Sequence, residues 1–113
     1  MPLPAGGRTL PTMHGSYPVL WQDGATAAPV AGRLSLGPHS LSLHGGSRSR
    51  QARLEVPYAE LTAAERSPQR LGPLRTIRFD SRHGGTVMLA GLGGMGASLE
   101  ILEALCRIIA ANA

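Results

Sequence analysis

The sequence predicts a mainly β fold, in which an antiparallel sheet of six or seven strands is followed by one C-terminal helix. Short segments of alternating apolar and polar residues recur along the chain, as is typical of strands with one buried face. The connections between them are too short for parallel crossovers, so neighbouring strands must run antiparallel. Residues 86–113 predict a strand, a glycine-rich turn and a helix whose wide apolar arc must lie on a sheet.

The composition predicts one folded domain with one core. The chain has 113 residues, of which 42% are hydrophobic and 16% charged. All eleven basic residues are arginine, and the formal charge of +4 favours acidic partners. The absence of lysine, with abundant Ala, Gly, Arg and Pro, indicates a GC-rich bacterial genome. Neither a signal-peptide core nor a membrane-length apolar run is present, so we expect a cytoplasmic protein.

The strands can be placed from the alternation of apolar residues. Residues 1–16 are rich in Pro and Gly and predict a flexible leader, which leaves 17–113 as the domain. The segments 30–36 and 40–44 alternate on either side of a Gly-Pro-His turn and predict a hairpin with one leucine face. Further strands are expected over the apolar or alternating segments 17–21, 52–56, 74–79 and 87–90.

Two segments before the last hairpin are harder to assign. Residues 58–66 favour a helix by intrinsic propensity, and Pro57 before them indicates an edge strand or a bend. Residues 67–73 are polar and contain Pro and Gly, which predicts a loop.

The C-terminal helix is predicted to begin at Ser98, whose hydroxyl would cap the first turn. Its apolar stripe is formed by Leu102, Leu105, Cys106 and Ile109 and is widened by Leu99, Ile101 and Ile108. Cys106 is the only cysteine, so an internal disulfide and a cysteine zinc cluster are excluded. We expect this thiol to pack as a small hydrophobe.

Three stretches resemble the pleckstrin-homology-like superfold, including its GRAM-type and bacterial members. They are 32–45 (GRLSLGPHSLSLHG), 54–66 (LEVPYAELTAAER) and 75–90 (RTIRFDSRHGGTVMLA). The resemblance covers 17–110 and implies a seven-stranded antiparallel bent sheet, or partly open barrel, capped by one C-terminal helix. It also implies that 58–65 is a strand.

The glycine-rich turn satisfies a nucleotide-binding pattern without its context. Gly91-Leu92-Gly93-Gly94-Met95-Gly96 matches G-x-G-x-x-G between a strand and a helix. Only seventeen residues follow Gly96, too few for a second parallel strand and an acidic residue about twenty positions further on. We therefore interpret the pattern as a flexible turn and predict no cofactor; the remaining alternative is an anion held at the helix N-terminus.

The arginines fall into two groups that could bind an anion if their hairpins shared one rim, namely Arg48, Arg50 and Arg53, and Arg75, Arg78 and Arg82. The alternative is a solubilising edge that discourages strand pairing. Phosphoinositide-binding members of the superfold carry basic residues in the first loop, but the corresponding segment 22–29 has none and contains Asp23. Aromatic residues for stacking nucleobases are also missing, which argues against nucleic acid.

No pattern of catalytic or metal-binding residues is present. The histidines at 14, 39, 44 and 83 lack metal-ligand spacing, and Ser40, His39 and Asp80 form no nucleophile motif. The sequence therefore predicts a non-enzymatic, PH-like module that docks a protein partner at a strand edge or beside the helix. Candidate anchors are Tyr17, Trp21 and Tyr58, and the sequence is equally consistent with a core position for each of them. The alternative is arginine-mediated binding of an anionic membrane or another polyanion.

Overall fold

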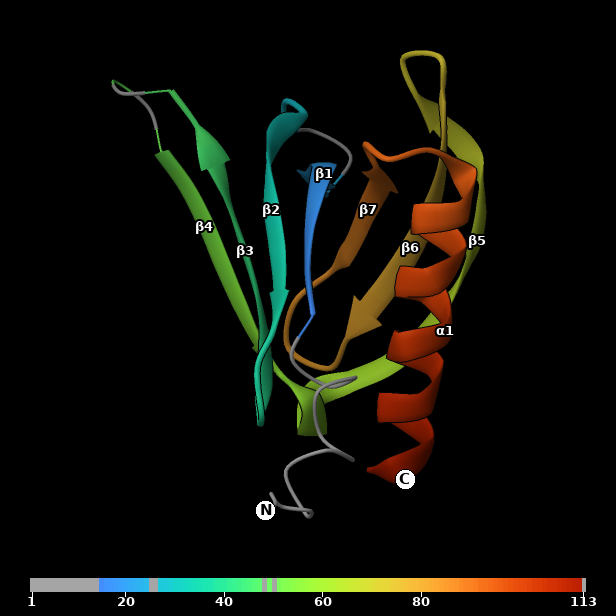
Figure 1. Cartoon of the computed structure of the whole chain (residues 1–113). Helices are drawn as coiled ribbons and strands as arrows, with labels where there is room; N and C mark the ends of the chain where they lie inside the picture. Colours follow the sequence, from blue (N-terminus) through green and yellow to red (C-terminus); the bar gives the residue numbers. More distant parts are fainter. Residues whose placement is uncertain (1–14, 25–26, 48, 50, 113) are drawn as a thin grey trace, which may run out of the picture.

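The computed structural model describes residues 15–24, 27–47, 49 and 51–112, and these form one curled sheet and one α-helix (Figure 1). In chain order the elements are β1 (Ser16–Asp23), β2 (Val30–Leu36), β3 (Ser40–Gly46), β4 (Gln51–Pro57), a 3-10 turn η3 (Tyr58–Glu60), β5 (Leu61–Leu71), β6 (Leu74–Ser81), β7 (Thr86–Gly91) and α1 (Met95–Ala111). The seven antiparallel strands are ordered β4-β3-β2-β1-β7-β6-β5, so β4 and β5 are the edges. This confirms the predicted fold class.

The core lies on the inner face of the sheet, where α1 packs against β5, β6 and β7. The helix buries Ile101, Leu105 and Ile108 completely, in the same cluster as Phe79 and Leu89. The predicted leucine hairpin is also confirmed. Its register places Leu34 opposite Leu43 and Leu36 opposite Leu41, and all four side chains are buried.

The β2–β3 hairpin depends on a cross-strand pair of glycines. Gly32 lies opposite Gly45, and a Cβ on Gly32 would overlap the backbone carbonyl of His44. A Cβ on Gly45 would lie 2.6 Å from the carbonyl oxygen of Ala31. The indole Nε1 of Trp21 donates to the His44 carbonyl oxygen at 3.1 Å, next to this pair. The two glycines therefore allow strands and indole to approach more closely than side chains would permit.

The segment after β4 differs from the propensity-based prediction. Helical structure is limited to the single turn η3, and the residues from Leu61 onward form strand β5, as the resemblance implied. The predicted loop 67–73 is also wrong, because β5 continues to Leu71. Its ladder shifts register between Ser67 and Arg70, where Pro68 lies in a bulge of an edge strand and so interrupts no central pairing.

The helix begins one turn earlier than predicted. Gly94, with φ of 107°, precedes its first residue, Met95, so Ser98 is not the N-cap. Ser98 is instead 2% exposed, and its hydroxyl accepts a hydrogen bond of 2.8 Å from the Gly91 amide at the end of β7. Gly94 provides the backbone conformation that the turn requires. The Ser98 hydroxyl is therefore not used as a cap and links the helix to the end of β7 instead.

The buried face of α1 is also rotated from the predicted stripe. It consists of Ser98, Ile101, Leu105 and Ile108. Cys106 is exposed, contrary to our expectation, and its thiol lies 3.7 Å from the Ala64 carbonyl oxygen on β5. The apolar arc is wide enough to suit several orientations, and the contact with β5–β7 selects one. Residues 1–14 of the predicted leader lie outside the described residues, and Ser16 already belongs to β1.

Candidate functional site

One cleft lies on the outer face of the sheet, opposite the core. It has a volume of 490 Å³, and we call it the Arg78 cleft. The register places Glu65, Arg78 and Met88 in one row across β5, β6 and β7, and on β6 and β7 this row alternates with buried residues. The lining residues are Gly24, Glu65, Ser67, Pro68, Gln69, Arg78, Thr86 and Met88.

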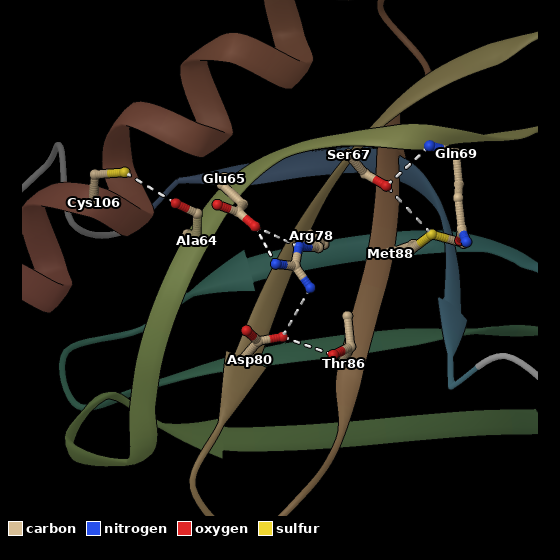
Figure 2. A network of polar contacts seen from close by, with 9 residues as sticks. All are labelled: Ala64, Glu65, Ser67, Gln69, Arg78, Asp80, Thr86, Met88 and Cys106. Carbon is tan, nitrogen blue, oxygen red and sulfur yellow. Dashed lines mark hydrogen bonds and ion pairs between the residues drawn. The ribbon is translucent and has the colours of Figure 1, made fainter.

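The charged groups of this cleft are paired with one another (Figure 2). Arg78 Nε donates to Glu65 Oε2 at 2.8 Å, and Nη2 donates to the same oxygen. Asp80 Oδ1 lies 3.9 Å from Arg78 Nη1 and accepts a hydrogen bond of 2.7 Å from the Thr86 hydroxyl. The Glu65 carboxylate raises the pKa of Arg78 above its usual value. Because two carboxylates already neutralise Arg78, the cleft lacks the free positive charge that an anion site needs.

The predicted arginine groups do not share one rim. Arg48 and Arg50 lie outside the described residues. Arg53 is exposed on β4, and four strands separate β4 from β6 in the sheet. Arg75 lies at the start of β6 and Arg82 beyond its other end, about 20 Å apart at strand spacing. The separation of β4 from β6 could not be predicted from the alternation of residues, because it depends on the order of strands in the sheet.

The predicted aromatic anchors are mostly core residues. Trp21 is 2% exposed and Tyr58 is 3% exposed. The Tyr58 hydroxyl donates to the Gly37 carbonyl oxygen at 2.6 Å, and burial raises the pKa of this phenol. Tyr17 is half-buried, and burial together with the neighbouring Glu100 carboxylate raises its pKa. Trp21 and Tyr58 therefore have almost no surface to offer a partner.

A smaller cleft of 290 Å³ lies where the β5–β6 turn meets the connection from β7 to α1. We call it the turn cleft; its lining residues are Pro73, Leu74, Arg75, Gly91, Gly94, Met95 and Ser98. Among the described residues the exposed large hydrophobic side chains are Leu92 in this connection and Met95 at the start of α1, which are 48% and 43% exposed. Sequence reasoning missed both residues because it interpreted the glycine motif as a turn. The sequence feature that could have revealed them is the presence of two apolar residues within a glycine-rich segment.

Two arginines lie beside the turn cleft. Arg70 and Arg75 are directly opposite in the β5–β6 ladder, and both are exposed. Arg70 Nη1 donates to the Pro73 carbonyl oxygen at 3.3 Å. Neither arginine forms an ion pair with a described residue. Like charges at opposite positions destabilise a ladder unless an anion lies near them.

Ser40 and Asp80, which were considered as catalytic residues, take part in separate interactions. The Ser40 hydroxyl donates to Glu55 Oε2 at 3.0 Å, while Asp80 is engaged by Thr86 and Arg78. No group of three potential metal ligands occurs within the described part of the chain. In the same part of the chain, no helix has the length and apolar character needed to cross a membrane.

The comparisons with known proteins bear on the fold alone. No family model matches the chain, and no curated protein matches it. Among solved structures, it is similar to the C-terminal domain of an unknown protein from Leishmania infantum, with a TM-score of 0.63 and 17% sequence identity. The similarity covers 89% of this chain and 97% of that domain.

Proposed function

We propose that this protein is a non-enzymatic, PH-like binding module that docks an acidic protein segment at the turn cleft. The strand order and the C-terminal helix support the PH-like part of the proposal. The observation that carries the docking part is that Met95, an exposed apolar side chain, lines this cleft together with Arg75, while the exposed Leu92 lies three residues before Met95 in the chain.

The chemistry of the cleft defines the segment that would fit it. Pro73, Leu74 and Met95 provide apolar surface, and a volume of 290 Å³ can receive one or two apolar side chains. Arg70 and Arg75 would pair with carboxylates on either side of such an anchor. A short acidic segment with one Leu, Met or Phe satisfies both requirements. Binding energy in such sites is concentrated in the buried apolar anchor, and the charges direct orientation and association rate.

A protein segment fits this site better than an anionic membrane. A concave cleft is filled by a side chain, whereas a bilayer presents a broad surface to the molecule. Three of the eleven arginines (Arg8, Arg48 and Arg50) lie outside the described residues, which leaves eight described arginines against seven acidic residues. Arg78 and Arg107 are paired with carboxylates, and Arg70 and Arg75 form a group of two, fewer than the roughly four to eight clustered basic residues that hold proteins on anionic lipid.

Titration of ¹⁵N-labelled protein separates these possibilities. The probe is a set of synthetic peptides with one Leu or Phe between Asp and Glu residues, and the control set replaces the acids with Lys. We expect amide shifts at residues 91–98 and 74–75 with the acidic set alone, and their loss in Leu92→Glu and Met95→Glu. Ala111→Glu, an exposed change at the other end of α1, is the matched control.

A second titration uses phosphatidylglycerol vesicles at low and physiological salt. Vesicle binding without peptide binding would replace the protein-docking proposal with membrane association. Absence of shifts with both probes would overturn the proposal.

A further inference from the structure

The two edges of the sheet differ in how they are covered. Edge strand β5 is bulged at Pro68, and the Cys106 thiol on α1 contacts the Ala64 carbonyl oxygen. Edge strand β4 pairs with β3 without any register shift, and no described strand pairs with its other side (Figure 1). A regular, uncovered edge is a template for another strand.

The direction of the free backbone groups on β4 can be derived from one hydrogen bond. The Tyr58 amide donates to the His39 carbonyl oxygen at 2.9 Å, on the side of β3. Backbone groups of successive strand residues point to alternate sides, so those of Arg53 and Glu55 point to the open edge. Pro57 has the same orientation, and its missing amide costs no bond to β3.

We propose that β4 pairs antiparallel with β4 of a second copy of this chain, with the twofold axis at Leu54. In this register Arg53 of each copy lies opposite Glu55 of the other on the outer face. Both residues direct their amides and carbonyls across the new interface, which gives hydrogen-bonded pairs with complementary charges. A twofold dimer requires such a self-complementary surface.

The inner face of β4 fits the same register. Ala52 and Leu54 are only half-buried, although Leu43, the neighbour of Leu54 on β3, is completely buried. Pairing about Leu54 places the two Leu54 side chains together and each Ala52 beside Val56 of the other copy. The pairing therefore covers apolar surface that the single chain leaves partly open.

The charges distinguish this pairing from non-specific strand addition. Across β2, β3 and β4, Arg33, His44 and Arg53 form a row of directly opposite exposed side chains. Arg53 forms no ion pair with a described residue. Glu55 of a second copy would extend this row with a negative charge. A strand shifted by one residue would face its apolar side chains outward, so the register is specific.

The first test is sedimentation velocity over a range of protein concentrations. We expect wild type to show a monomer–dimer equilibrium, and R53E and E55R to remain monomeric because each places like charges opposite one another. An equimolar mixture of R53E and E55R should restore a dimer, as should the double variant R53E/E55R. R82E, which makes the same charge change as R53E at an exposed loop position, is the matched control and should behave as wild type.

The second test is disulfide trapping in a C106S background. L54C should form an intermolecular disulfide, because opposite residues of a non-hydrogen-bonded pair have Cα atoms about 4.5 Å apart. A52C is the matched control; the two copies of residue 52 would lie about 13 Å apart, too far to bridge. Monomeric wild type at all concentrations, a dimer unchanged by R53E, no dimer in the mixture, or equal crosslinking of L54C and A52C would each overturn the proposal.

Discussion

The substitution Gly32→Ala should test whether the close approach of β2 and β3 supports the fold. The added methyl group would overlap the His44 carbonyl, which is backbone and cannot move as a flexible side chain does. The strands would have to separate locally, and overpacking of this kind costs about 1–3 kcal/mol. Loss of the hydrogen bond from Trp21 to the same carbonyl would add about 1 kcal/mol. We therefore expect the free energy of unfolding to fall by about 2–4 kcal/mol.

Urea unfolding followed by tryptophan fluorescence suits this measurement, because Trp21 is the only tryptophan and its indole lies beside Gly32. A loss of this size corresponds to a decrease in Tm of roughly 10–20 °C. Gly96→Ala is the matched control, because a Cβ there meets no atom within 4 Å and the residue is helical. This control should raise stability by about 0.5–1 kcal/mol. If Gly32→Ala unfolds at the wild-type urea concentration with unchanged fluorescence, the glycine pair has no such role.

Three further changes test other parts of the fold. Leu105→Ala should lower the free energy of unfolding by about 2–5 kcal/mol in chemical denaturation, because the side chain is completely buried; a loss below 1 kcal/mol would contradict the packing of α1 on the sheet. Ser98→Ala should cost about 1–3 kcal/mol by the same assay, since the Gly91 amide would lose its buried acceptor; wild-type stability would refute this link. The pKa of Tyr58 is raised in the fold, so its contribution to stability is complete below the usual tyrosine pKa of about 10 and is lost as the pH rises through the higher folded value. Thermal melts between pH 8 and pH 11 should therefore show a fall that is weaker in Tyr58→Phe, and identical pH profiles would argue against it.

The strands that could be predicted are those in which local and tertiary requirements agree. The β2–β3 hairpin has alternating leucines and a Gly-Pro turn, and each inward leucine finds a partner across the ladder. Strand β5 could not be found from propensity, since Ala, Glu and Arg favour a helix. It is a strand because β6 offers a ladder beside it, and its bulge accommodates Pro68.

The site was less predictable than the fold because its residues are brought together by turns rather than by a sequence pattern. The sequence grouped the arginines by proximity along the chain. In the structure, however, Arg75 lies at the start of β6 and Arg82 lies beyond its other end. For the aromatic side chains, the sequence was equally consistent with surface and core positions. In the structure, Trp21 and Tyr58 are buried in the core. The exposure of Leu92 and Met95 depends on the turn that Gly94 allows, which no periodicity encodes.

The two proposed surfaces should act independently, and this independence can be measured. No residue of β4 lines the turn cleft, so pairing through β4 leaves the cleft of each copy open. R53E should therefore bind a single acidic peptide in solution as tightly as wild type does. On a surface carrying the same peptide at high density, wild type can engage two peptides and R53E only one, so R53E should dissociate at least tenfold faster, which is a modest gain for bivalent binding. Equal dissociation rates of both proteins at all peptide densities would mean that the two clefts of one dimer cannot both reach peptides on the same surface.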